Sequence, residues 1–139
     1  MRLEVQGKLP VENITPARMR SAILGLRSYG PRAYASLTDS DGSYLQVGGG
    51  RQTCVLERRD ALSGRHFRAY HDAPSKVFAD GTELCFAGQR IKLAANEWVT
   101  ADMAVEVFLA FLEGRAAPGW VKWRDITDRF EDFSPSARC

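Results

Sequence analysis

The sequence is poor in the residues that build metal and redox sites. Its 139 residues include two histidines and three cysteines, and no pair of cysteines has CxxC spacing. A sparse, odd set of cysteines argues against a disulfide framework and against a zinc site. Cys54 and Cys85 lie in apolar, strand-like segments, so we expect both to be buried thiols that pack as small hydrophobic side chains. We therefore expect neither a metal nor a cofactor.

Long hydrophobic runs are also missing. No segment approaches the roughly 18 apolar residues of a membrane-spanning helix. The first ten residues, MRLEVQGKLP, contain no apolar core of a secretion signal. We therefore expect a protein of the reducing cytoplasm that has no membrane partner.

A large excess of one charge is absent as well. The formal net charge is +2, which is too small by itself to indicate a nucleic-acid or membrane surface. The charge is unevenly distributed, however. Residues 1–96 contain 14 basic and 9 acidic residues, whereas residues 97–133 contain 4 basic and 8 acidic residues. This acidic region could face a basic partner, although an ordinary solvated surface has the same composition.

Two segments carry the signals of amphipathic helices. Thr15 is a suitable N-cap, Pro16 fits the first helical position, and Gly30 followed by proline should end the first helix. Thr100 and Gly114 bound the second helix in the same way. Its expected buried stripe consists of Ala104, Val107, Phe108, Phe111 and Leu112.

Between the helices the hydrophobic pattern changes to a period of two residues. Turn signals such as Asp41-Gly42 and Asp80-Gly81 separate the apolar segments, which is typical of hairpins. We expect strands near residues 33–38, 43–47, 52–59, 65–71, 83–87 and 90–94. Residues 2–6 could begin the sheet, and residues 120–123 form a short aromatic strand.

These elements predict one α+β domain over residues 1–139. Its expected architecture is a single antiparallel meander sheet of about six or seven strands, with two helices packed on one face. Residues 1–8 and 134–139 are expected to be loosely ordered ends.

The residues most often used in catalysis are poorly arranged for it. His66 and His71 are an odd number of positions apart, so on a regular strand they face opposite sides of the sheet. The segment from Asp39 to Ser43 resembles a calcium loop but lacks the later ligands, and we interpret it as a hairpin turn. We interpret residues 48–50, three consecutive glycines, as a hairpin connection or bulge. We therefore predict no catalytic residues.

Aromatic residues beside charges remain as candidates for binding. Arg68 and Tyr70 share one face of a strand and could form a strip that stacks nucleic-acid bases. Trp120 and Trp123 face opposite sides of a regular strand, so one is expected in the core and the other against the C-terminal segment or a partner.

The C-terminal third of the chain resembles a known family. From Val99 to Phe130 the features that carry the resemblance are Phe108, Phe111, Leu112, Gly114, Pro118 and the closing Val121-Lys122-Trp123. The segments 44–50 (YLQVGGG) and 55–59 (VLERR) also fit the middle of that family. Over roughly residues 35–130 the chain is similar to the first Imm-type family of immunity proteins, which belong to bacterial polymorphic toxin systems.

The resemblance implies a binding protein and not an enzyme. An immunity protein binds its cognate toxin domain, such as a nuclease or a deaminase, in the cytoplasm and occludes its active site. The residues that we expect to bind the partner are Tyr44, Arg68, Tyr70, Trp123, Asp125, Asp128, Glu131 and Asp132. No direct contact with nucleic acid is expected, and a homodimer is possible.

Two alternatives remain open from the sequence. One is a small nucleic-acid-binding or adaptor α+β module that uses the Arg68 and Tyr70 strip. The other is an enzyme or small-ligand binder that uses His66 or His71 with a neighbouring carboxylate.

Overall fold

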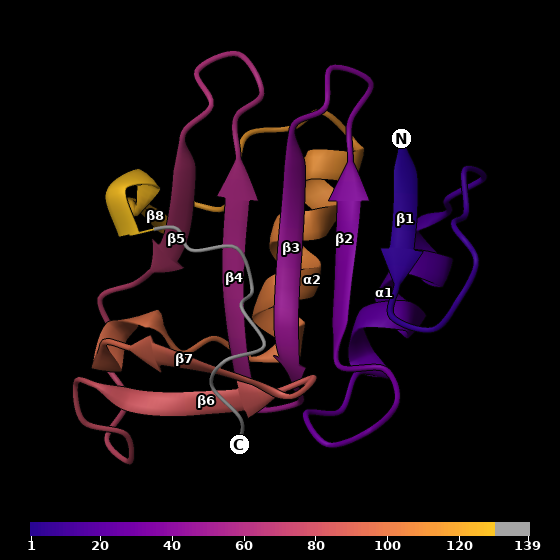
Figure 1. Cartoon of the computed structure of the whole chain (residues 1–139). Helices are drawn as coiled ribbons and strands as arrows, with labels where there is room; N and C mark the ends of the chain where they lie inside the picture. The colour runs from indigo at the N-terminus through magenta and orange to yellow at the C-terminus, as the bar shows by residue number, and fades with distance from the viewer. Residues whose placement is uncertain (130–139) are drawn as a thin grey trace.

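A six-stranded antiparallel sheet forms the centre of the protein (Figure 1). The computed structural model describes residues 1–129. The strand order is β1–β2–β3–β4–β5–β8, so β8 returns after the second helix to pair with β5. The strands are β1 (Arg2–Val5), β2 (Tyr34–Thr38), β3 (Tyr44–Gly50), β4 (Thr53–Arg59), β5 (His66–Tyr70) and β8 (Lys122–Asp125).

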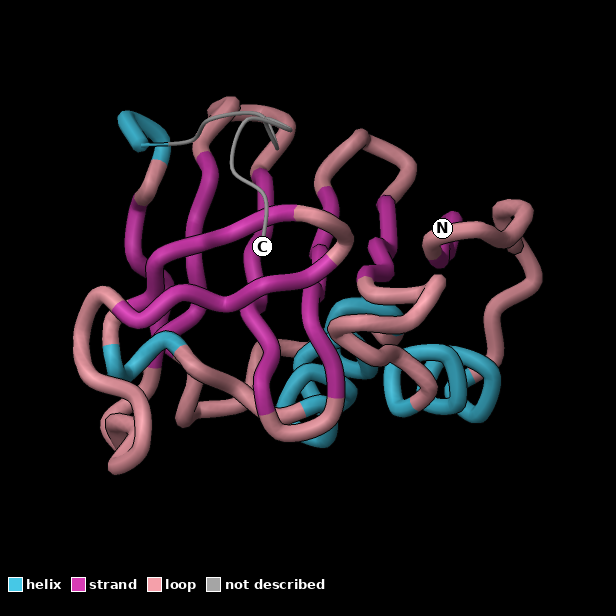
Figure 2. Tube along the Cα trace, turned by 60° about the horizontal axis from the view of Figure 1, so that its bottom comes forward, coloured by secondary structure: helices cyan, strands magenta, loops and turns pink. Residues whose placement is uncertain are grey.

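Two helices cover one face of this sheet, α1 (Pro16–Leu24) and α2 (Ala101–Leu112) (Figures 1 and 2). Thr15 and Thr100 cap them as expected, each accepting a hydrogen bond from a backbone amide three residues later. Alternate strand residues point to the helices and form the main core with them. Fully buried members include Met19, Ile23, Leu37, Leu45, Val47, Leu56 and Phe108.

A hairpin of β6 (Thr82–Phe86) and β7 (Gln89–Leu93) packs on the other side of the sheet (Figure 2). A second apolar cluster joins it to the sheet and to Trp98, and the 3-10 turn η1 (Ala95–Glu97) leads from it to α2. Gly48 permits this close packing, since a Cβ at that position would overlap the ring of Phe86. A last 3-10 turn, η2 (Thr127–Arg129), follows β8.

The expected α+β class, with an antiparallel meander and two helices on one face, is confirmed. The sheet is divided, however, because the strands expected at 83–87 and 90–94 pair only with each other among the described residues. The sixth position, next to β5, is taken by β8, whose expected range of 120–123 begins two residues too early. Val121 precedes the strand and closes a turn by donating its amide to the Pro118 carbonyl.

Two expectations at the N-terminal end need correction. Residues 2–5 form edge strand β1, because Leu3 and Val5 are buried in the main core; this confirms the strand expected at residues 2–6 and corrects the loosely ordered end expected at residues 1–8. Helix α1 ends at Leu24 and not near Gly30. Arg27 satisfies the carbonyls of Leu24 and Leu26 through Nη1, at 2.9 and 2.6 Å, which replaces a further helical turn. The expected loose end at 134–139 lies outside the described residues.

Candidate partner-binding surface

The eight expected partner-binding residues do not form one patch. Tyr44, Arg68 and Tyr70 lie on the sheet face opposite the helices, because their neighbours Leu45 and Ala69 point into the main core. The other five come from β8 or follow it in sequence. Among the described residues, the structure therefore separates Arg68 and Tyr70 from Trp123, whereas Tyr44, at the start of β3, contributes to the pocket that Trp123 also lines.

Arg68 is held in an ion-pair network and does not offer a free charge. Its Nε atom donates to Glu57 at 2.8 Å, and its Nη1 atom lies 3.7 Å from a carboxylate oxygen of Glu97. Arg124 donates to the second oxygen of Glu97 at 2.7 Å. Only 13% of the Arg68 side chain is exposed. The expectation of a solvated Arg68 is therefore wrong, because the hairpin and η1 bring Glu97 against this part of the sheet.

Tyr70 lies on the same face of the sheet as Arg68. The guanidinium carbon of Arg124 lies 4.5 Å from the centroid of the Tyr70 ring, and Tyr70 is half-buried. Tyr44 is half-buried in β3, opposite Arg59 of β4. The Arg68 and Tyr70 strip is therefore largely occupied by contacts within the protein.

Trp123 lies on the helix-covered face, where it contacts the half-buried Arg58. The guanidinium carbon of Arg58 is 4.9 Å from the Trp123 ring centroid and 4.2 Å from the Phe67 ring centroid. These separations are those of cation–π contacts. The Nε atom of Arg58 is buried and has no hydrogen-bond partner. Burial lowers the pKa of the Arg58 guanidinium below its ordinary value, while the charge of Asp60 opposes that shift.

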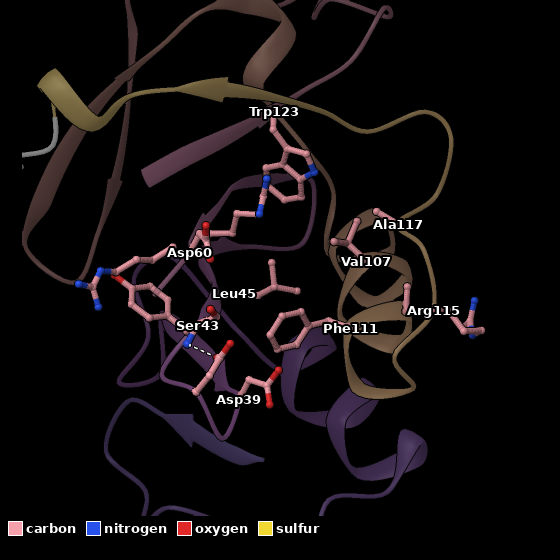
Figure 3. A pocket seen from close by; sticks show the side chains of 14 residues that line it. Asp39, Ser43, Leu45, Asp60, Val107, Phe111, Arg115, Ala117 and Trp123 are labelled. Atoms are coloured by element: carbon pink, nitrogen blue, oxygen red, sulfur yellow. Dashed lines mark hydrogen bonds between the residues drawn. The ribbon is translucent and has the colours of Figure 1, made fainter. Parts of the chain in front are cut away.

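A pocket of about 380 Å³ opens beside this arginine, between the sheet and the C-terminal half of α2 (Figure 3). In Figure 3, Leu45, Val107 and Phe111 meet at its centre, with Trp123 at one end and Asp39 at the other. Three loops supply the remaining walls. The full lining is Asp39, Asp41, Ser43, Tyr44, Leu45, Arg58, Arg59, Asp60, Val107, Ala110, Phe111, Arg115, Ala117 and Trp123. The pocket thus combines an apolar interior with a rim that carries both charges.

Asp125 and Asp128 follow Trp123 in the sequence, and both residues are exposed to solvent. Asp125 accepts hydrogen bonds from the Thr127 hydroxyl at 2.6 Å, the Thr127 amide at 2.9 Å and Arg65 at 2.6 Å. The Thr127 bonds, followed by Arg65, lower the pKa of Asp125 to about 2. Asp128 is exposed in η2. Two further expected residues, Glu131 and Asp132, lie outside the described residues.

The cysteines differ from each other. Cys54 is fully buried in β4, and burial raises the pKa of its thiol to about 12. A thiol that stays protonated at neutral pH is a poor nucleophile, in agreement with the packing interpretation. Cys85 is half-buried and disulfide-bonded, so the expectation of a buried thiol is wrong at that position.

The histidines do not converge. His71 lies just past the end of β5, where its Nδ1 atom accepts from the Ala73 amide at 3.2 Å. That bond leaves Nε2 to donate to the Trp98 carbonyl at 2.7 Å, which ties the end of β5 to the connection before α2. His66 lies within β5. Among residues 1–129, no three His, Cys, Asp or Glu residues are grouped so that they could hold a metal ion.

The loop segments act mainly in folding. Asp39 and Ser43 close the β2–β3 hairpin through a backbone bond of 2.8 Å, as expected for a turn. The glycines at 48–50 lie in β3 and not in a connection. A Cβ at Gly50 would lie 2.6 Å from the Leu26 carbonyl oxygen, so this glycine allows the chain after α1 to approach the sheet.

Sequence reasoning missed Arg58 as a candidate, although a signal was present. Positions 54, 56 and 58 share one face of β4. Since Cys54 was expected in the core and Leu56 is apolar, the alternation alone would have placed the Arg58 side chain toward the helices. A charged residue at the end of a buried stripe is a mark of a pocket or an interface.

The sequence matches no family model and no curated protein. Neither α1 nor α2 is long and apolar enough to cross a bilayer, and the same holds for every helix within residues 1–129.

Proposed function

We propose that this protein is an immunity protein, a non-catalytic inhibitor that binds a cognate secreted bacterial toxin domain in the cytoplasm and occludes its active site. The resemblance of residues 35–130 to the first Imm-type family is the starting point. The structure adds a surface whose chemistry suits a protein partner, at the loop end of the sheet beside α2.

The pocket beside Trp123 is the observation that carries this proposal. Its interior is apolar, its rim holds both acidic and basic side chains, and a half-buried tryptophan forms one end. Protein interfaces have this arrangement of an apolar centre with a polar rim, and tryptophan and arginine are enriched among their hot spots. Of the expected binding residues, Tyr44 and Trp123 line this pocket.

Acidic side chains extend this surface. Asp125 lies two residues after Trp123, and its low pKa keeps it ionised at neutral pH. Asp128, three residues after Asp125, is also exposed to solvent. Arg65 pairs with Asp125 at 2.6 Å, so this border presents both charges, and such charges favour correct encounter with a toxin such as a nuclease more than final affinity.

Coexpression with the toxin domain encoded beside this gene tests the proposal. We expect a complex that copurifies and restores growth of the toxin-expressing host. Trp123→Ala should weaken the complex by at least tenfold, whereas Tyr29→Ala, at a residue that is 90% exposed after α1, should leave it unchanged. If the wild-type pair neither copurifies nor restores growth, the proposal fails for that pair.

The nucleic-acid alternative receives less support. Its strip would use Arg68 and Tyr70, and both are engaged by Glu57, Glu97 or Arg124. Binding of RNA or DNA that falls steeply with added salt would nevertheless favour it over a toxin partner. Size-exclusion chromatography at several concentrations tests the possible homodimer.

The cytoplasmic location can be tested separately. Disulfides rarely persist in a reducing cytoplasm, and Cys85 is disulfide-bonded. If the protein resides in the reducing cytoplasm as proposed, thiol labelling in intact cells should find the Cys85 disulfide reduced. An oxidised Cys85 in cells would argue for an oxidising compartment instead.

A further inference from the structure

Arg58 differs from the other arginines that have little contact with solvent. Arg68 and Arg124 lie on the opposite side of the sheet, and each faces a buried carboxylate of Glu57 or Glu97. Arg58 forms no ion pair with a carboxylate of residues 1–129, and its guanidinium contacts two aromatic rings instead. Asp60 acts on the half-buried Arg58 only through its charge, and a buried nitrogen left without a hydrogen bond, as Nε is, costs folding free energy. This cost suggests that the pocket retains Arg58 for a ligand.

The nearby aspartates are already used in turns. Asp41 accepts from the Ser43 amide at 2.9 Å, and Asp60 accepts from the Ser63 hydroxyl at 2.7 Å. Asp39 accepts from the Ser40 amide. Each carboxylate therefore stabilises its own loop, and none completes the hydrogen bonding of Arg58.

The guanidinium remains accessible from the pocket. Nε is its one nitrogen that is buried without a partner, and neither Nη atom donates a hydrogen bond within residues 1–129. The Nη atoms therefore keep contact with solvent. Phe67 and Trp123 both contact the guanidinium, and such packing lowers the side-chain entropy lost when a ligand binds.

We propose that this pocket binds a carboxylate carried on an apolar or aromatic group, with Arg58 as its cationic partner. The planar guanidinium matches a carboxylate in shape and can donate two parallel hydrogen bonds. Leu45, Val107 and Phe111 form the apolar wall that would receive the body of the ligand. This ligand class goes beyond the proposed immunity function and does not depend on it.

The rim charges favour a singly charged ligand. Asp39, Asp41 and Asp60 surround the entrance, whereas Arg59 and Arg115 are the basic residues there. A phosphate dianion would be repelled by three carboxylates, while one carboxylate needs only the single charge of Arg58. The volume of about 380 Å³ also lies at the small end of the usual range for ligand pockets.

NMR titration of the full chain with 3-phenylpropionate tests the site, and the neutral amide 3-phenylpropanamide is the matched probe. We expect the acid to shift the Trp123 indole signal, assigned with Trp123→Phe, and to bind at least tenfold more tightly than the amide. Equal binding of acid and amide would overturn the proposal, as would no shift at Trp123. This comparison uses the wild-type protein and does not depend on a variant that folds.

Variants then identify the cation. Arg58→Gln should abolish the preference for acid over amide, and Arg58→Lys should retain part of it. Arg115→Gln is the control, because Arg115 lies on the same rim but is exposed and paired with Glu113. An acid preference that survives in a folded Arg58→Gln protein, or that is lost in Arg115→Gln instead, would contradict the assignment to Arg58.

The same carboxylate could belong to a free acid or to an acidic side chain of a partner protein. The blocked tripeptide acetyl-Leu-Glu-Phe-amide and its glutamine counterpart distinguish these sources. Binding that requires the glutamate and competes with 3-phenylpropionate supports a protein side chain. Binding of 3-phenylpropionate alone supports a small organic acid, and binding of neither probe overturns the proposal.

Discussion

Glu97 accepts a hydrogen bond from Nη1 of Arg124 at 2.7 Å, across the gap between the turn before α2 and edge strand β8. The other oxygen of Glu97 accepts from the Ala94 amide at 2.6 Å and lies 3.7 Å from Arg68. One carboxylate thus connects η1, β5 and β8. Since only 4% of its side chain is exposed, these contacts are protected from screening by solvent.

Glu97→Gln should be strongly destabilising. Glutamine can still accept from the Ala94 amide, but it leaves Arg68 and Arg124 without their shared negative charge. Removing one member of a buried ion pair costs about 3–5 kcal/mol. Because Arg124 is partly exposed, we expect the lower part of this range for the free energy of unfolding, measured with urea.

Glu83→Gln provides the matched control. Glu83 also faces an arginine, Arg90, but their side chains are 38% and 42% exposed and the atoms are 3.7 Å apart. Exposed pairs of this kind contribute about 1 kcal/mol or less. Equal losses in the two variants would show that burial of Glu97 does not strengthen its network.

Gly48→Ala should destabilise the contact between the hairpin and the sheet. A Cβ at position 48 would overlap the ring of Phe86, whose residue is only 2% exposed. Overpacking of this kind typically costs about 1–3 kcal/mol. Thermal or urea unfolding measures the loss, and Gly119→Ala is the control because a Cβ there meets no atom within 4 Å.

A double mutant separates this clash from a general effect of alanine in β3. In a Phe86→Leu background the added methyl group has more room, so Gly48→Ala should cost less than in the wild type. Additive losses would contradict the assignment of Gly48 to the Phe86 contact.

Local sequence signals predicted much of this fold. Thr15 and Thr100 were recognisable caps, and the period-two segments between residues 33 and 94 matched β2 to β7. The sequence could not show that β6 and β7 leave the main sheet, because both remain amphipathic strands in either arrangement. Their position depends on Phe86 fitting over Gly48, a contact between residues 38 positions apart.

The candidate surface was harder to predict for a similar reason. Arg68 had the pattern of a solvated strand residue, yet Glu97, 29 positions later, covers and pairs with it. For Arg58 the two signals disagreed. Its position in β4 indicated a side chain that points into the core, whereas its charge indicated a side chain exposed to solvent. Which of two alternating faces is covered depends on the whole topology and not on the strand alone.

The Cys54 thiol should make stability depend on alkaline pH. Its pKa is raised to about 12 in the folded protein, while an unfolded cysteine titrates near about 8.5. Above the unfolded pKa the unfolded chain loses this proton first, so its contribution to stability is complete below that pH and declines as pH rises toward about 12.

Cys54→Ala isolates this effect from other groups that titrate in base. Urea unfolding between pH 7 and 10 should show a shallower loss of stability in the variant than in the wild type. Parallel pH profiles would contradict the prediction. Alkylation offers a second measurement, because native Cys54 should react with iodoacetamide far more slowly than the denatured chain does.

Asp125 allows two causes of one pKa shift to be separated. The Thr127 hydroxyl is the largest cause of its low pKa, and Arg65 contributes less. Thr127→Val, which keeps the backbone amide, should therefore raise the Asp125 pKa more than Arg65→Gln does. Carboxyl NMR titration measures both values, and a larger rise in Arg65→Gln would reverse the assigned order.

The sign of the accompanying stability change follows from the direction of the shift. The pKa of Asp125 is depressed to about 2 in the folded protein, whereas an unfolded aspartate titrates near about 3.9. Its contribution is therefore complete above the unfolded value and is lost as pH falls toward 2. Thr127→Val should reduce this acid dependence, because it brings the folded pKa of Asp125 closer to the unfolded one. If the stability of the variant falls between pH 4 and 2 as steeply as that of the wild type, other carboxylates determine the loss of stability in acid.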